Sequence, residues 1–158
     1  VDTRIRKAVE GQYDAIILAG AGLTRLGLEE HVTQWLPLEV MLPAPGQGAL
    51  GVQCRADDEE TLLLLSALED DPTRASVTAE RQFLLGLGGG CAVPVAAYAA
   101  VSERQLAIRL TGLVASIDGK QIVRVSGEGA DPFDLGNCLA QEAIAKGADE
   151  ILALIAES

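Results

Sequence analysis

Cys91 has the surroundings that most favour covalent chemistry in this chain. It follows three consecutive glycines, residues 88–90, and precedes the Ala-Val-Pro sequence of residues 92–94. Glycines place little steric bulk around a neighbour, so such a loop would present the thiol of Cys91 to a cleft. A thiolate attacks electrophilic carbon and can hold the product as a covalent group. The plainer alternative is a small buried cysteine at the start of a strand.

Two groups of basic residues suit an anionic ligand. Arg4, Arg6 and Lys7 fall in the first two turns of a predicted helix, where cations oppose the helix dipole. Residues that break such a local rule are candidates for function, and a helix N-terminus with arginines nearby suits a carboxylate or a phosphate. Arg25 lies just beyond the C-terminal end of a predicted strand, the edge at which open α/β sheets bind ligands. A solvated basic face and an ordinary charge at a helix C-terminus are the plainer interpretations.

The composition limits the classes of function. The chain has 158 residues and a formal net charge of −11, which argues against binding duplex DNA by bulk charge. Only 3% of the residues are aromatic, which argues against a base-stacking surface. The sequence contains no apolar stretch of about 18 residues that would span a membrane. We therefore expect neither a nucleic acid nor a membrane as partner.

The cysteines and the single histidine favour a reducing compartment without a metal. Cys54 and Cys138 lie far from Cys91 and from each other, and we interpret both as structural. His31 is the only histidine, and the sequence has no Cys-x-x-Cys pair. A zinc site and a disulfide framework are therefore not expected.

The first 50 residues combine helix and strand signals. Thr3 is predicted to cap a helix over residues 4–10, with Gly11 beyond its end. The apolar run at residues 13–19 predicts a buried parallel strand. The elements expected after it are a short helix that starts at residues 20–22, runs through Arg25 and ends at Gly27, a helix over 28–36 and a short strand at 39–42. A buried strand needs neighbours, and only one short helix precedes it, so we expect this chain to be the C-terminal part of a longer protein.

The remaining residues predict an antiparallel sheet flanked by helices. Residues 43–48 form a loop rich in turn-forming residues, and residues 49–54 read as a strand. The helices expected after it span residues 57–68, 72–87, 132–146 and 148–156. Three strands are predicted at residues 93–101, 105–116 and 121–128, with an Asp-Gly turn between the last two. The fold class is therefore an α/β partial domain followed by an α+β domain with a three-stranded antiparallel sheet.

Taken together, seven segments resemble the porphobilinogen deaminase (hydroxymethylbilane synthase) family, in order and over essentially the whole chain. The segments are residues 3–7 (TRIRK), 13–19 (YDAIILA), 21–27 (AGLTRLG), 43–51 (PAPGQGALG), 78–81 (TAER), 89–94 (GGCAVP) and 147–152 (GADEIL).

The resemblance implies an enzyme that joins four porphobilinogen molecules head to tail, losing ammonia each time. It implies a dipyrromethane cofactor attached through a thioether to Cys91, on which the polypyrrole grows. Arg4 and Arg25 match family arginines that bind the pyrrole carboxylates, a task that suits guanidinium groups. Ala19 and Gln47 match positions that line the cleft.

The resemblance also implies a division into domains. Residues 1–48 would be the C-terminal part of the second domain, an α/β domain similar to periplasmic binding proteins. Residues 49–66 would form the hinge and the segment that returns to the first domain. Residues 67–158 would be the third domain, with the cofactor cysteine on a loop.

Some features depart from the family pattern. Gly88 stands where relatives commonly have an acidic residue, and no carboxylate here matches the family's catalytic aspartate, which lies in the N-terminal part that this sequence lacks. We therefore expect that the chain alone turns over no substrate and that it acts in the cytoplasm, with the missing N-terminal domain as its partner.

Two other classes of function remain open from the residues alone. A non-catalytic anion-binding module of the periplasmic-binding-protein type would use the same arginines without a covalent adduct. A scaffold fragment in which the cysteine is merely packed would use neither the arginines nor a covalent adduct.

Overall fold

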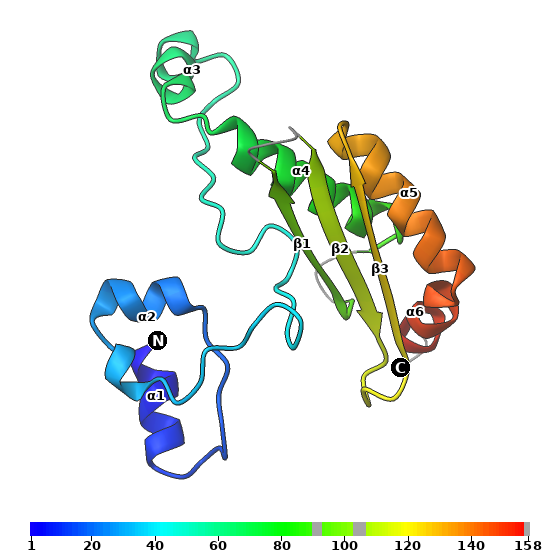
Figure 1. Cartoon of the computed structure of the whole chain (residues 1–158). Helices are drawn as coiled ribbons and strands as arrows, with labels where there is room; N and C mark the ends of the chain where they lie inside the picture. The colour runs from blue at the N-terminus through cyan, green and yellow to red at the C-terminus, as the bar shows by residue number, and fades with distance from the viewer. Residues whose placement is uncertain (90–92, 103–106, 157–158) are drawn as a thin grey trace. The chain divides into compact units, whose positions relative to one another are not determined.

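The structure is a computed structural model that describes residues 1–89, 93–102 and 107–156. The chain divides into two compact units, Val1–Met41 and Leu42–Ser158 (Figure 1). Within the described ranges, no helix is both long enough and apolar enough to cross a membrane.

The first unit contains two helices and one helical turn. Helix α1 spans Asp2–Val9, α2 spans Gly20–Leu26, and the 3₁₀ turn η1 spans Glu29–His31. Gly27 ends α2 in the left-handed conformation that favours glycine, with φ of 66°, as predicted. The predicted cap at Thr3 is wrong, because α1 begins two residues before the predicted start, at Asp2, with Val1 in the N-cap position.

The strand predicted at residues 13–19 is also wrong. The structure assigns no strand anywhere in residues 1–41, all of which it describes. Tyr13 is 54% exposed and Ile17 is 60% exposed, whereas Ile16 and Leu18 are partly buried, so the apolar run is not covered on both faces. A strand exists only through hydrogen bonds to a partner, and this unit provides none.

Three further predictions fail for related reasons. The predicted helix over 28–36 is reduced to η1, and residues 38–40 form a turn where a short strand was expected. Residues 51–55 have no regular structure where a strand was predicted over 49–54. Leu50 is 90% exposed and Val52 is 65% exposed, so among the described residues no strand pairs with that segment.

The second unit is built on a three-stranded antiparallel sheet in the order β1-β2-β3. The strands span Val95–Val101, Ile108–Ala115 and Ile122–Gly129, close to the predicted ranges. Ala97 pairs with Gly112, and Gly112 pairs with Val125. Alternate residues of each strand point to one face, which is the buried one.

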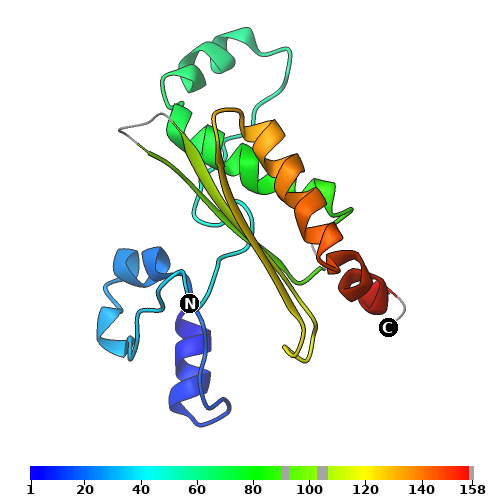
Figure 2. The same ribbon diagram turned by 45° about the vertical axis from the view of Figure 1, so that its right-hand side comes forward.

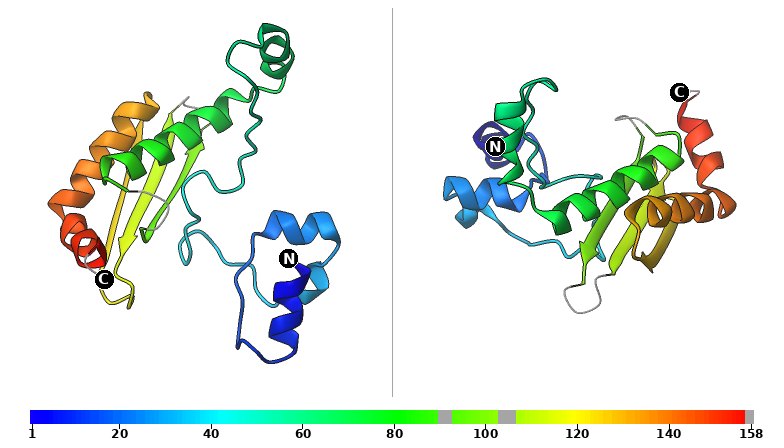
Figure 3. Two further views of the ribbon diagram at one scale, coloured as in Figure 1. Left: turned by 180° about the vertical axis from the view of Figure 1, so that it is seen from behind. Right: turned by 90° about the horizontal axis from the view of Figure 1, so that it is seen from above.

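Helices α4 (Asp71–Gly86) and α5 (Pro132–Ala145) cover that buried face, and α6 (Ala148–Ala156) follows α5 (Figures 1 and 2). Helix α3 (Glu59–Ser66) precedes α4. Asp70 and Asp131 are the N-caps of α4 and α5, and each is followed by a proline at the start of its helix. The sheet and its helices, seen from behind and from above in Figure 3, confirm the α+β half of the predicted fold.

Small residues allow close packing in this core. Gly112 lies beneath the ring of Phe83, which is fully buried. A Cβ atom on Gly136 would lie 2.7 Å from the carbonyl oxygen of Ala79, so α5 approaches α4 backbone to backbone. These contacts fix α4 against the sheet.

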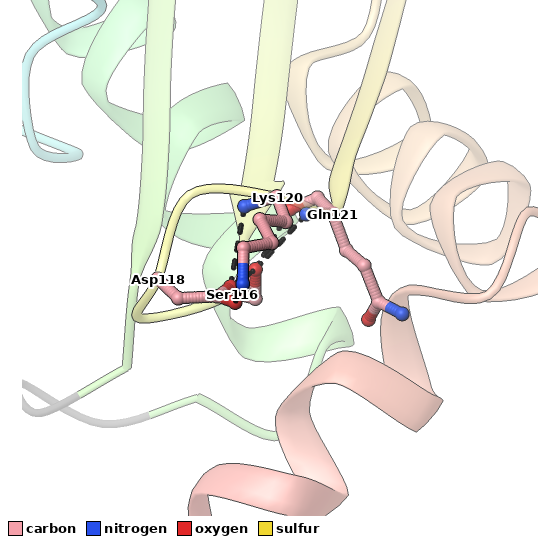
Figure 4. A network of polar contacts seen from close by, with 4 residues as sticks. All are labelled: Ser116, Asp118, Lys120 and Gln121. Atoms are coloured by element: carbon pink, nitrogen blue, oxygen red, sulfur yellow. Dashed lines mark hydrogen bonds and ion pairs between the residues drawn. The ribbon is translucent and has the colours of Figure 1, made fainter.

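The turn between β2 and β3 is closed by a polar network (Figure 4). The hydroxyl of Ser116 donates to Oδ1 of Asp118 at 2.6 Å, and the amide of Lys120 donates to the same oxygen at 3.2 Å. These bonds hold the pKa of Asp118 below its ordinary value, the Ser116 bond most of all. Gly119 has φ of 70°, so the predicted Asp-Gly turn is confirmed.

Candidate functional site

Arg4 lies at a pocket in the first unit. Arg4 and Lys7 project from α1 into a depression of about 620 Å³, which Tyr13, Ile16 and Ile17 also line. In the described part of the chain, no ion pair involves either cation. Arg4 is exposed and Lys7 is partly buried. Two unpaired cations at one depression suit a carboxylate ligand.

Two of the three cations on α1 lie at the end of the helix that favours them. Arg6 and Lys7 lie in the last turn of α1, where cations are favourable, and the acidic Asp2 lies in its first turn. Arg6 also forms an exposed ion pair with Glu10, at 3.8 Å. Arg4, the third residue of α1, is therefore the one cation of the three that opposes the helix dipole. The case for an anion site rests mainly on the unpaired side chains of Arg4 and Lys7.

Arg25 and Ala19 lie at the two ends of α2. Arg25 is exposed in the last turn, and the described residues offer it no ion-pair partner. Ala19 is the N-cap residue, in extended conformation, and its carbonyl oxygen accepts a hydrogen bond from Gly22 at 3.1 Å. The segment before Ala19 is not a strand, so the strand-edge argument for Arg25 does not apply within this chain.

Gln47 lies in the turn of residues 45–48 in the second unit. Its side chain is exposed, and its backbone amide donates to the carbonyl oxygen of Ala44 at 2.9 Å. Gly46 and Gly48 on either side have φ of 76° and 89°, a conformation that other residues rarely adopt. The loop of residues 43–48 is therefore an ordered turn whose shape requires its glycines.

Glu80 of α4 holds this loop, and it is the one charged side chain that is buried among the described residues. Its Oε2 accepts a hydrogen bond from the amide of Gly46 at 2.6 Å, and its Oε1 accepts one from the amide of Ala99 in β1 at 2.8 Å. Burial raises the pKa of Glu80, and the two backbone bonds oppose that shift.

The C-terminal end of α4 leads toward Cys91, which itself lies outside the described residues. Gly88 has φ of 69°, its amide donates to Leu85, and the amide of Gly89 donates to Leu84. This pattern is a Schellman motif with glycine in its left-handed position. Gly88, the departure from the family pattern, thus takes a conformation that an acidic residue would adopt only with strain.

The other two cysteines do not form a site. Cys54 is half-buried in an irregular segment, and Cys138 is exposed on α5; the strand predicted around Cys54 is absent. Across the described ranges, no three Asp, Glu, His or Cys side chains are grouped so that they could hold a metal ion.

Three residues of interest were not singled out by sequence reasoning: Tyr13, Glu80 and Arg81. Arg81 lines a second pocket of about 560 Å³ between residues 46–54, α3 and α4. Glu80 carries a signal in the sequence, because it lies three residues before Phe83 on the apolar face of α4. A charged residue on such a face indicates a buried polar contact, although not with which partner.

Two family models match the chain. Residues 1–63 match the model described as porphobilinogen deaminase, dipyromethane cofactor binding domain. Residues 75–145 match the porphobilinogen deaminase C-terminal domain. Arg4, Ala19, Arg25 and Gln47 fall in the first match, and Cys91 falls in the second.

Curated proteins similar to this chain are named porphobilinogen deaminase. The chain is 54% identical over 153 residues to the porphobilinogen deaminase of Brevibacillus brevis, a match that covers 97% of this chain and 49% of that protein. It is 50% identical over 154 residues to the Roseiflexus castenholzii protein, covering 97% and 50% of the two chains. The Synechococcus elongatus protein is 49% identical over 154 residues, covering 96% and 48%.

Both models describe domains of a single enzyme family, and together they account for most of the chain. The chain belongs to the porphobilinogen deaminase family. It spans about half the length of the curated relatives it matches.

Proposed function

We propose that this chain is part of a hydroxymethylbilane synthase, which condenses four porphobilinogen molecules head to tail with loss of ammonia at each step. The observation that carries the proposal is the match of both family models, at 54% identity to a relative named porphobilinogen deaminase. The unpaired cations Arg4 and Lys7 support it, because every pyrrole of the substrate carries carboxylates and the product is a polyanion.

The cofactor we infer is a dipyrromethane bound as a thioether to Cys91. The thioether forms when the sulfur of Cys91 bonds to the methylene carbon of a porphobilinogen unit, the carbon–nitrogen bond breaks, and the thiol proton leaves with the nitrogen as ammonia. When bound, the group supplies the primer to which pyrroles are added. The first model's description names this cofactor, and the donors at the Arg4 pocket fit its carboxylates.

Each predicted site residue has a role in this proposal. Arg4 and Arg25 bind carboxylates of the cofactor or of the growing chain, and Ala19 and Gln47 line the cleft. Cys91 holds the cofactor through its sulfur.

We further infer the three-part division of residues 1–48, 49–66 and 67–158. In the longer protein, residues 1–48 would belong to a periplasmic-binding-protein-like α/β domain, and residues 49–66 would return to the first domain. The large exposed fractions of Ile17, Leu50 and Val52 support this, since apolar side chains that are mostly exposed here would gain cover from a further domain. The catalytic aspartate would come from the part that this chain does not match, so the chain alone turns over no substrate. We infer a cytoplasmic enzyme.

The proposal is tested with a chimera in which this chain replaces the matching 153 residues of the Brevibacillus brevis relative. The chimera should consume porphobilinogen and release hydroxymethylbilane, whereas the chain alone should not. Arg4→Gln and Arg25→Gln should each lower kcat/KM about ten- to hundredfold, since a hydrogen bond to a charged group is worth about 1.5–3 kcal/mol.

The matched control is Arg109→Gln, which removes an exposed arginine paired with Glu128 on the second unit and should leave turnover unchanged. A chimera that never turns over porphobilinogen would instead indicate a non-catalytic anion-binding module, provided that its affinity for porphobilinogen is the same with Cys91 as with Cys91→Ser.

A further inference from the structure

The buried carboxylate of Glu80 connects three segments that are far apart in sequence. It projects from α4, and its two oxygens accept from Gly46, 34 residues away, and from Ala99, 19 residues away. The exposed fraction of Glu80 is 6%. Burying a charge is costly unless it is hydrogen-bonded, so a carboxylate at this position implies that both bonds are kept.

The bonds of Glu80 lie at the free edge of the sheet. Strand β1 pairs with β2 on one side only, which leaves the amides of Ala97 and Ala99 directed outward. The amide of Ala97 donates to the carbonyl of Pro43 at 3.0 Å, and that of Ala99 donates to Glu80. The 43–48 loop and Glu80 therefore both cover this edge.

We propose that Glu80 is a positioning residue: its carboxylate holds the 43–48 loop against the edge of β1 and so fixes Gln47. The importance of Gln47 rests on the proposed function, but the placement of the loop does not. Leu42, which is 8% exposed, anchors the start of the loop, and the Gly46 amide anchors its far side. Gln47 directly follows that second anchor.

Two possible roles of Glu80 differ in their effect on a neighbouring hydrogen bond. If Glu80 holds the loop, its removal also releases the bond from Ala97 to Pro43, in which Glu80 takes no part. If Glu80 only accepts two bonds, Ala97 stays protected while Gly46 and Ala99 become exposed to solvent.

The test is residue-resolved amide hydrogen exchange by NMR on the 158-residue chain. In Glu80→Ala and Glu80→Gln, exchange at Ala97 should quicken about ten- to hundredfold, the effect of losing a bond to a charged group. The control is Glu142→Gln, the same change at an exposed residue of α5 that pairs with Lys146. Amides of the central strand β2 must stay protected, which shows that the sheet is folded.

Unchanged exchange at Ala97 in both variants overturns the proposal. If Glu80→Ala does not fold, Glu80→Gln, which keeps one carbonyl oxygen, decides the question. In the active chimera, Glu80→Gln should lower kcat/KM while the cofactor adduct on the protein remains. Since hydrogen exchange needs no turnover, an inactive chimera with the expected exchange result refutes the proposed function and not the role of Glu80 in the loop.

Discussion

Substitution of Gly112 by alanine tests the packing that fixes α4 on the sheet. A Cβ atom on Gly112 would lie 2.3 Å from Cζ of Phe83 and 2.5 Å from its Cε1. The ring of Phe83 is fully buried, with an exposed fraction of 0%, and lies in the hydrophobic core, so a shift of the ring would disturb neighbouring core side chains. Overpacking a tight core costs about 1–3 kcal/mol, and replacing a strand glycine returns about 0.5–1 kcal/mol. We expect Gly112→Ala to lower the free energy of unfolding by about 1–2 kcal/mol.

The assay is urea denaturation of the 158-residue chain, in single and double variants. In a Phe83→Leu background the ring is gone, so Gly112→Ala should cost nothing or stabilise the chain, with a coupling energy of about 1–3 kcal/mol. Gly51→Ala is the matched control, because nothing lies within 4 Å of the position that its new methyl group would take and its φ is not positive. A Gly112→Ala penalty that is absent, or that is the same with and without the Phe83 ring, would refute this packing.

Three further predictions concern the caps and the buried carboxylate. Gly88→Ala should destabilise the second unit by about 1 kcal/mol, because alanine is strained at a φ of 69°; thermal denaturation would reveal this as a lower Tm. Asp131→Ala should also cost about 1 kcal/mol in urea denaturation, since it removes the acceptor for two amides at the start of α5, whereas Asp131→Asn should recover most of the loss. Burial raises the pKa of Glu80 above its ordinary 4.5, so the stability that wild type has over Glu80→Gln should be greatest below pH 4.5 and should fall as the pH rises through the raised pKa. An equal difference at every pH, measured by urea denaturation over a pH series, would contradict that assignment.

The sheet of the second unit and the helices that cover it could be predicted from sequence because their signals are local, whereas the strand expected at residues 49–54 of the same unit is absent. Alternating apolar residues define the three strands, Asp118-Gly119 defines the turn, and Asp131-Pro132 marks the start of α5. Each of these signals acts within a few residues, and the structure satisfies them all inside the same unit.

The first unit could not be predicted in the same way. The apolar run at residues 13–19 carries the composition of a buried strand, yet a strand forms only when another strand accepts its hydrogen bonds. Thr3 resembles a cap, but α1 starts two residues before the predicted helix, at Asp2, whose charge is favourable at the N-terminal end of a helix. Composition alone did not reveal whether residues 13–19 would find a strand partner, or whether the helix would start after Thr3 or at Asp2.

For the candidate site, the sequence predicted which residue types would bind the ligand better than it predicted how those residues are arranged. Arg4 and Arg25 were identified from charge and spacing, and the structure leaves both exposed and, among the described residues, without an ion-pair partner. The role of Glu80 was beyond reach, because its two donors come from residues 34 and 19 positions away. Such a contact depends on the completed fold and not on any local pattern.

The most direct test of the central claim is peptide mass mapping of the chimera after it is purified from cells. The account predicts that the peptide with Cys91 carries the added mass of one dipyrromethane, and that peptides with Cys54 and Cys138 are unmodified. A chimera that consumes porphobilinogen while its Cys91 peptide has the unmodified mass would contradict the account.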